Sequence, residues 1–134
     1  MSRRHIARLT AVLSVAAGVW LAAIRLADAQ SQSYFGAISF SPSSGAAGWG
    51  FDFPSRGEAA EASLRNCSRY ADDCEVVTWF ADGCGALVAS KESFIAVWNP
   101  SKEVALRRAM LRCRAEDGPG CAVVRWVCTT NSQW

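Results

Sequence analysis

The sequence predicts an α+β domain made of two strand–strand–helix–strand repeats, with about six strands and two helices stapled by disulfides. Three observations indicate this fold. The pattern of 54–79, from a Pro-Ser pair to a Trp, recurs over 100–126. Within each copy the hydrophobic period changes between two and about 3.6 residues, which is typical of strands alternating with a helix. Six cysteines in a short chain indicate a disulfide framework.

The first 29 residues have the three-part layout of a secretory signal peptide. A basic stretch, 2–8, precedes the uncharged apolar run Leu9–Ile24, and Ala27-Asp28-Ala29 resembles a cleavage site. The apolar run of about sixteen residues is shorter than the ~20 that span a bilayer, so a cleaved signal is favoured over a retained anchor. The Ser2-Arg3-Arg4 start leaves the twin-arginine export route open.

We therefore expect one mature domain, residues 30–134, with repeats at about 34–82 and 84–128. It is expected to be secreted or periplasmic, with no stable membrane anchor after signal removal. Without residues 1–29 the chain has ten basic and eleven acidic residues, a formal charge near −1, against +2 for the whole chain. This balance does not indicate phosphate binding, so no nucleic-acid partner is expected.

The mature domain lacks histidine, because His5 lies in the signal. It therefore has no imidazole for a catalytic base, a triad or a metal site. The sequence also lacks a Cys-x2-Cys pair, so zinc is not favoured over disulfides. We expect no cofactor and no metal.

Each repeat is predicted to contain a hairpin, a helix and a third strand. Ser55 and Glu58 have the spacing of a capping box at the first helix start. The expected elements are strands at 34–40, 46–53, 74–80, 85–88, 94–98 and 121–128, and helices that begin at Ser55 and Ser101.

The side-chain pattern predicts which faces are buried. The first helix is expected to face its sheet with Ala60, Leu64 and Cys67, and the second with the larger Leu106, Met110 and Cys113. In the second strand, Trp49, Phe51 and Phe53 alternate, which predicts one aromatic face with Gly48 and Gly50 on the other.

The repeat narrows the 15 pairings that six cysteines allow. Cys67 and Cys74 occupy the same places as Cys113 and Cys121, at a helix end and at the next strand start. The main alternative links equivalent positions across the repeats, as in Cys67–Cys113. The favoured pairs are Cys67–Cys74, Cys113–Cys121 and Cys84–Cys128.

The spaced pattern Gly-Ala, Pro-Ser, Cys, Cys-x-Val-Val-x-Trp and Cys-Gly-Ala-Leu resembles a bacterial exported family catalogued as domain of unknown function 4189. The match covers roughly Tyr34 to Cys128. The resemblance implies a small secreted or periplasmic domain, and it brings no agreed activity and no catalytic residues. This chain departs from the pattern at Asn99, where the family usually has an aromatic residue, and at Val104, where a capping-box Glu is missing. The residues that carry the resemblance are Gly36-Ala37, Pro54-Ser55, Cys67, Cys74, Val76-Val77, Trp79, Cys84-Gly85-Ala86-Leu87, Pro100-Ser101, Cys113, Cys121, Val123-Val124, Trp126 and Cys128.

The missing catalytic equipment and the aromatic-rich strands favour a binding or interaction module, with a protein or glycan partner in the envelope or outside the cell. Trp49 and Trp98 lie on hairpin strands and are the candidate binding residues, since exposed aromatics on a sheet recognise sugars, peptides and proteins. Core packing competes with this interpretation. Trp79 and Trp126 are equivalent in the repeat, so we assign them to the core.

Two alternatives stay open. A cell-envelope hydrolase or secreted toxin would use carboxylates such as Asp72, Asp73, Glu75 or Asp82, although no catalytic residue is assigned and enzyme activity is not decided. The second alternative is an envelope protein with a mainly structural role. A functional site is expected where the two repeats differ. One such place is the turn 41–48 of the first repeat, which corresponds to 91–93 in the second. The other is the helix face with Arg107-Arg108 in the second repeat and Glu61-Ala62 in the first.

Overall fold

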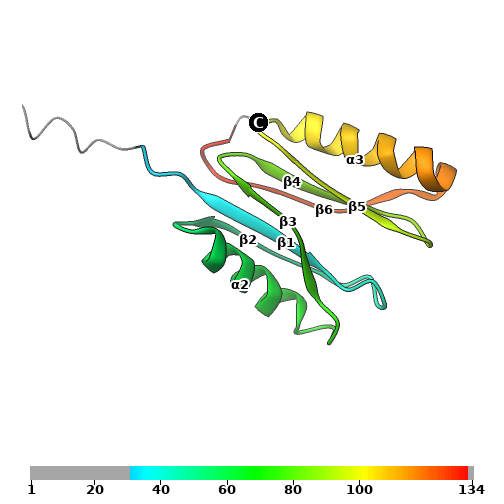
Figure 1. Cartoon of the computed structure of the whole chain (residues 1–134), viewed down its shortest axis with the longest axis horizontal. Coiled ribbons are helices and arrows are strands. Elements are labelled where there is room, and N and C mark those ends of the chain that lie inside the picture. Colours follow the sequence, from blue (N-terminus) through cyan, green and yellow to red (C-terminus); the bar gives the residue numbers. More distant parts are fainter. Residues whose placement is uncertain (1–30, 133–134) are drawn as a thin grey trace, which may run out of the picture. The chain divides into compact units, whose positions relative to one another are not determined.

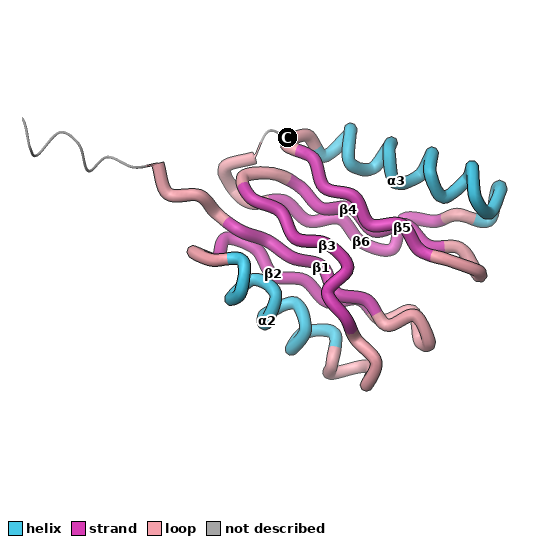
Figure 2. The backbone as a smooth tube through the Cα atoms, in the orientation of Figure 1, coloured by secondary structure: helices cyan, strands magenta, loops and turns pink. Residues whose placement is uncertain are grey.

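The computed structural model describes residues 31–132, and the predicted signal peptide with its export route lies outside them. Among these residues, no helix is both long and apolar enough to cross a membrane. Figures 1 and 2 show the arrangement of the elements. In chain order they are β1 (Phe35–Phe40), β2 (Ala47–Phe53), α2 (Arg56–Cys67), β3 (Glu75–Ala81), β4 (Cys84–Ala89), β5 (Phe94–Asn99), α3 (Lys102–Asp117), the 3-10 helix η2 (Gly118–Gly120) and β6 (Ala122–Cys128).

Each repeat forms its own antiparallel sheet. The first sheet has the strand order β2-β1-β3, and the second has β5-β4-β6. The central strand of each sheet is the first strand of its repeat, and the other two strands are its edges. The predicted α+β class, with two strand–strand–helix–strand repeats, is confirmed.

The elements stack in four layers. α2 packs on β1 and β2, α3 packs on β4 and β5, and the two sheets face each other between the helices (Figures 1 and 2). Contacts between the sheets join β1 to β4, β2 to β6, and β3 to β5. The sandwich therefore has two open sides, one where β2 lies by β6 and one where β3 lies by β5.

The space between the sheets is filled around Phe80. This fully buried ring lies in one apolar cluster with Ile38, Phe40, Leu87 and Val127. A Cβ at Gly36 would lie 2.3 Å from the Phe80 ring, and one at Gly85 would lie 2.7 Å from it. The glycine of the repeated Gly-Ala pair thus makes room for Phe80, while Ala37 and Ala86 face the helices.

The helices face the sheets with smaller side chains than the sequence predicted. The expected stripe is displaced by about one position, so Leu64, Leu106 and Met110 are only partly buried. The buried stripes occupy equivalent places and let the helix backbones come close to the sheets. They are Ala59, Ser63 and Cys67 in α2, and Ala105, Ala109 and Cys113 in α3.

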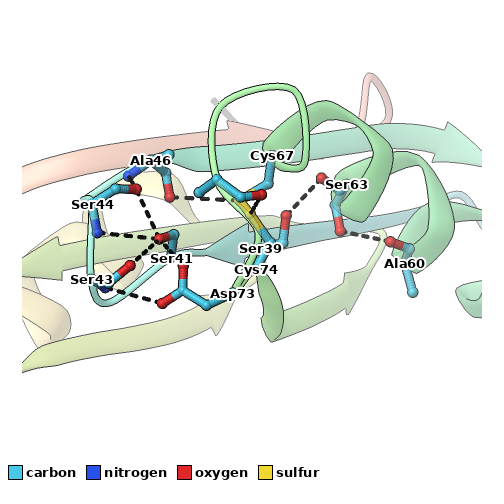
Figure 3. Close-up of a disulfide and its surroundings, with 11 residues drawn as sticks. Ser39, Ser41, Ser43, Ser44, Ala46, Ala60, Ser63, Cys67, Asp73 and Cys74 are labelled. Atoms are coloured by element: carbon cyan, nitrogen blue, oxygen red, sulfur yellow. Dashed lines mark hydrogen bonds between the residues drawn. A yellow bond between two sulfur atoms is a disulfide. The ribbon is translucent and has the colours of Figure 1, made fainter.

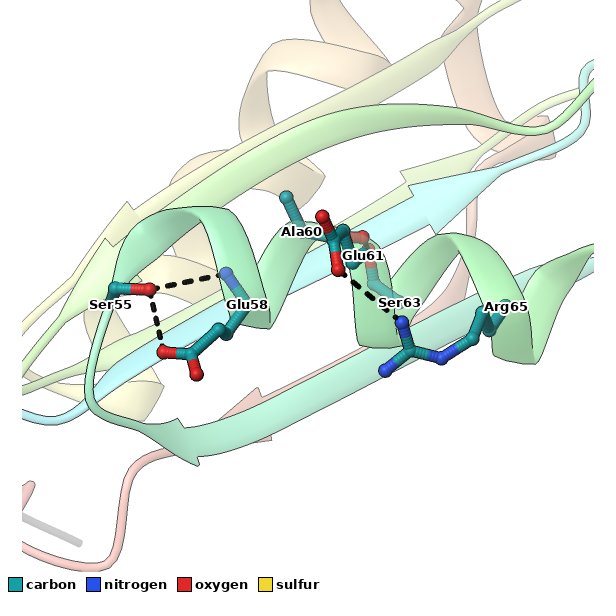
Figure 4. A network of polar contacts seen from close by, with 6 residues as sticks. All are labelled: Ser55, Glu58, Ala60, Glu61, Ser63 and Arg65. Atoms are coloured by element: carbon teal, nitrogen blue, oxygen red, sulfur yellow. Dashed lines mark hydrogen bonds and ion pairs between the residues drawn. The ribbon is translucent and has the colours of Figure 1, made fainter.

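The predicted Ser55 cap begins α2. Ser55 Oγ accepts from the Glu58 N–H at 3.3 Å and donates to Glu58 Oε2 at 2.7 Å (Figure 4). The glutamate therefore binds the serine hydroxyl, whereas in a full capping box it reaches the N-cap backbone N–H. The exposed ion pair of Glu61 with Arg65, at 3.5 Å, adds little to helix stability.

The predicted aromatic face of β2 is wrong at Phe53, because the strand contains a bulge. Phe35 pairs with Phe53, but Ala37 pairs with Gly50, so β2 has one extra residue at this point. Asp52 takes up the irregularity with a φ of 62°. Beyond the bulge, Phe53 lies against Gly50 on the α2 side, whereas Trp49 faces the other sheet.

The three disulfides are Cys67–Cys74, Cys84–Cys128 and Cys113–Cys121, the pairs favoured from the repeat. Two of them tie the end of a helix to the start of the next strand, and Cys84–Cys128 joins the paired strands β4 and β6. Each bridge is expected to stabilise the domain by about 2–4 kcal/mol, mainly by restricting the unfolded chain.

The close seat of α2 on β2 gives a first prediction. A Cβ at Gly48 would lie 2.2 Å from Ser63 O and 2.3 Å from Cys67 N, both backbone atoms. Gly48→Ala should therefore lower the free energy of unfolding by about 1–3 kcal/mol or more, because the helix has to move away. Urea unfolding of the oxidised protein measures this change.

Gly57→Ala is the matched control, because a Cβ at that helical position meets no atom within 4 Å. It should leave the domain as stable or raise its stability by up to about 1 kcal/mol, through the better helix propensity of alanine. Equal effects of the two substitutions would contradict the proposed close contact.

Candidate functional site

A groove opens along one side of the sandwich, between the edge strands β2 and β6. Its volume is about 480 Å³. Four apolar residues of its lining, Phe51, Val123, Val124 and Trp126, are at least 36% exposed. Val123 and Trp126 lie opposite Val88 and Ala86, so their side chains are on the α3 face of β6. Exposed apolar groups concentrated in a groove are typical of binding sites. The lining residues are Trp49, Phe51, Val123, Val124, Arg125, Trp126, Val127, Cys128 and Thr130.

Arg125 supplies the one charge of this lining. Its Cζ lies 3.3 Å from the centre of the Trp49 ring, which is a cation–π contact between β6 and β2. The Nε atom is buried and has no hydrogen-bond partner among the described residues. Burial lowers the pKa of Arg125 from its ordinary value, although guanidinium remains protonated in proteins.

This guanidinium is not neutralised within the described part of the chain, where no carboxylate pairs with it. A buried polar atom left without a partner costs about 1–3 kcal/mol. The contact with Trp49 offsets part of that cost, since cation–π contacts contribute about 0.5–2 kcal/mol. The remaining cost is one that a ligand with a hydrogen-bond acceptor can remove.

Strand register explains why Arg125 and Trp49 meet. Arg125 lies opposite Leu87 in the β4–β6 ladder, and Leu87 faces the first sheet. Trp49 lies opposite Ile38 in the β1–β2 ladder, and Ile38 faces the second sheet. Since paired residues share one face of a sheet, both side chains enter the space between β2 and β6.

The opposite side of the sandwich lacks this pair. Ile38 and Leu87 are equivalent in the two repeats. Thr78 on β3 pairs with Ile38, as Arg125 on β6 pairs with Leu87. Ala96 on β5 pairs with Leu87, as Trp49 on β2 pairs with Ile38. The two repeats therefore differ at the groove, in addition to the turns and helix faces where the sequence predicted a difference.

The sequence-predicted binding residues are separated by the fold. Trp49 lines the groove, whereas Trp98 lies on β5 at the other side of the sandwich and is 49% exposed. Sequence reasoning missed Arg125, although a signal was available. Arg125 is the only Lys or Arg in the six strands. A basic residue in an otherwise apolar strand is a candidate for a functional role.

The assignment of Trp79 and Trp126 to the core is wrong, because they are 37% and 40% exposed. Trp79 pairs with Ala37 on the α2 side, and Arg56 Cζ lies 4.2 Å from its ring centre. Lys102 Nζ lies 4.6 Å from the ring of Trp126 in the equivalent arrangement. The repeated tryptophan thus forms a cation–π contact with the basic residue that follows each Pro-Ser pair.

The candidate carboxylate Asp73 holds a turn in place. It accepts hydrogen bonds from the Ser41 hydroxyl and, at 3.2 Å, from the Ser43 N–H beside the Cys67–Cys74 disulfide (Figure 3). These bonds lower the pKa of Asp73, with that from Ser41 as the main cause.

The second repeat has the same arrangement. Asp117 accepts from the hydroxyls of Ser90 and Ser93, both at 2.5 Å, and these bonds lower its pKa. In each repeat an aspartate at the end of the helix or shortly after it therefore holds the hairpin turn in place. This repetition indicates a structural role for Asp73.

Asp82, with a φ of 49°, is also engaged at a turn. Its Oδ1 accepts from the Asn131 side chain at 2.6 Å and from the Tyr34 N–H at 2.9 Å, and both bonds lower its pKa. The seven-residue strand β3 separates it from Asp73, roughly 23 Å at ~3.3 Å per residue. A glycosidase pair needs ~5 to ~9.5 Å, so the structure does not bring these two carboxylates together.

The other two candidate carboxylates, Asp72 and Glu75, are exposed. In the part of the chain that the structure describes, no three His, Cys, Asp or Glu side chains cluster in a way that could hold a metal ion.

Comparisons with known proteins support the fold. The model of the family described as "Domain of unknown function (DUF4189)" matches residues 35–128. The chain is also similar to the solved NMR structure of Rv1813c from Mycobacterium tuberculosis, with 23% sequence identity and a TM-score of 0.53. That similarity covers 71% of this chain and 74% of the other, and at this identity it shows the fold alone. No curated protein matches the chain.

The Asp73 cluster gives a prediction about pH. Because the hydrogen bonds hold the folded-state pKa of Asp73 below 3.8, they stabilise the domain fully above about that pH. This stabilisation is lost as the pH falls through the lower folded-state pKa. Asp73→Asn should therefore be less stable than the natural protein at pH 7, and the difference should shrink towards pH 2. Urea unfolding between pH 2 and 7 measures both.

Asp72→Asn is the control, since Asp72 is exposed and forms no hydrogen bond or ion pair among the described residues. It should leave the unfolding free energy nearly unchanged over the same range. A stability difference for Asp73→Asn that stays constant down to pH 2 would count against the cluster.

Proposed function

The chain belongs to the family described as domain of unknown function DUF4189, and we propose that it is a binding module that acts outside the cytoplasm, with the β2–β6 groove as its ligand site. The observation that carries the proposal is the buried Arg125 Nε without a partner, placed among exposed apolar side chains. A ligand would supply the missing acceptor and cover these side chains.

The lining of the groove supports recognition better than catalysis. The lining residues with polar side chains on the groove side are Arg125, Thr130 and Trp49 with its indole N–H, and Cys128 is in a disulfide. A general base or an activated nucleophile needs a carboxylate, an imidazole or a free thiol nearby. The lining contains none of these, whereas aromatic, apolar and guanidinium groups are those enriched at binding hot spots.

An oxidising compartment fits the covalent structure. All six cysteines are paired, and disulfides of this kind form and persist in the periplasm or outside the cell. The signal-like residues 1–29 agree with export. We therefore place the binding activity in the periplasm, the cell envelope or the medium, where the partner is a protein or a glycan.

Selection from two ligand classes tests the proposal. The oxidised protein is immobilised and presented with a random linear peptide library and, separately, with a set of defined cell-wall and other glycans. Phe51→Ala should lower the affinity for the selected ligands at least tenfold, because Phe51 is 44% exposed and lines the groove. Isothermal titration calorimetry with purified ligands measures the affinity.

Trp98→Ala is a matched control. Trp98 lies opposite Gly85 on an edge strand, as Phe51 lies at the bulge opposite Gly36, and both are about half exposed. It should leave the affinity within about twofold. If Trp98→Ala abolishes binding and Phe51→Ala does not, the ligand site lies on the other side of the sandwich and the proposal is wrong.

A further inference from the structure

We propose that the groove binds an extended peptide segment of a partner protein, with an Asp or Glu side chain of that segment on Arg125 and its backbone paired to the open edge of β6. This inference rests on the proposed function and adds the class of ligand. Three features of the groove carry it: an uncompensated guanidinium, free backbone groups along one strand, and the alternation of side chains on that strand.

The guanidinium indicates a carboxylate. Arg125 presents a planar set of donors, of which Nε has no partner, and no other lining residue carries a charge. Asp52, next to the groove residue Phe51, is already engaged by the Thr130 N–H at 2.9 Å. A carboxylate accepts two parallel hydrogen bonds from a guanidinium, and that bidentate pairing is stronger than a neutral hydrogen bond.

The backbone of β6 indicates an extended segment. The Cα atoms of Cys84 and Cys128 lie 4.0 Å apart, the short spacing of a non-hydrogen-bonded pair in an antiparallel ladder. Pairs alternate along the ladder, so Trp126, opposite Ala86, is also in such a pair. The N–H and C=O groups of Trp126 and Cys128 therefore point away from β4. No backbone hydrogen bond to these groups occurs from outside the sheet within residues 31–132.

An added strand would place its side chains on the required groups. Alternate side chains of a strand face opposite sides of a sheet. Arg125 faces Trp49 and the first sheet, whereas Trp126 faces the α3 side with Lys102. The acidic residue of the ligand would lie on the Arg125 side. An apolar residue two positions away would lie on the same side, within reach of Phe51.

Two other occupants fit less well. A neutral glycan stacks on aromatic rings but brings no charge to Arg125 and uses none of the paired donors and acceptors that a strand edge offers. A second copy of this chain, paired β6 to β6 about a two-fold axis, would bring two Arg125 side chains to the same interface. Like charges that face each other across a strand pair are destabilising. An acidic strand is therefore favoured over both.

The test uses three synthetic nine-residue peptides with blocked ends and alternating Thr and Val. The first has Glu at its centre, the second has Gln there, and the third keeps Glu but has N-methyl groups on alternate backbone amides of the binding edge. Titration calorimetry against the oxidised protein should show at least tenfold weaker binding for the Gln peptide and for the methylated peptide. Equal affinity of the Glu and Gln peptides would overturn the carboxylate, and equal affinity of the methylated peptide would overturn strand pairing.

Arg125→Gln completes a double-mutant cycle, in which the Glu and Gln peptides should bind the variant equally. Arg125→Lys should restore only part of the preference for Glu, since a lysine lacks the bidentate geometry. Dispersed amide signals in NMR spectra show whether each variant is folded. The comparison of peptides on the natural protein needs no variant and decides the question if the variants unfold.

The glycan set separates this inference from the proposed function. If a glycan binds with sensitivity to Phe51→Ala and none of the peptides bind, the groove is a ligand site and the peptide inference is wrong. If no ligand is sensitive to Phe51→Ala, the proposed function itself fails.

Discussion

A three-stranded sheet with a helix on one face still has a second apolar face to bury, and this constraint organises the whole domain. In each repeat the helix covers one face with its stripe of Ala, Ser and Cys, and the other face presents Ile38 and Phe80 or Leu87 and Val127. Neither repeat has a further element to cover that face. The two sheets cover each other, and the single core around Phe80 joins the halves.

The same constraint creates the groove. Two three-stranded sheets that meet face to face leave their edge strands open. Within residues 31–132, β2 and β6 on one side and β3 and β5 on the other have no further strands beside them. Open edges offer free hydrogen-bonding groups and are commonly blunted by charge or bulges. Here β2 carries a bulge at Asp52, and β6 carries Arg125. The features that protect the edge from unspecific pairing are thus also those that give the groove its chemistry.

The sequence predicted the framework well because the repeat reports on local structure. Pro-Ser starts a helix, and cysteines at equivalent places favour equivalent bridges. The errors concern strand faces. A single extra residue in β2, at Asp52, and another irregularity in β3, near Val77, reverse the facing of every later side chain, so Phe53 and Trp79 lie on the helix side. The bulge in β3 has no neighbouring glycine or proline to mark it. Arg125 could have been found, but its contact with Trp49 depends on how two distant repeats pack.

Each disulfide lies within one repeat, so the two halves are joined covalently only by the peptide chain at Asp82 and Gly83. All else that holds them together is non-covalent and resembles the interface of a symmetric dimer. Such an arrangement is what gene duplication and fusion of a self-associating half-domain would produce. In an ancestral dimer the two grooves would have been identical by symmetry, and any residue suited to a ligand would have appeared twice. A fused chain is free of that restriction, and here one side of the sandwich has Trp49 and Arg125 where the other has Ala96 and Thr78.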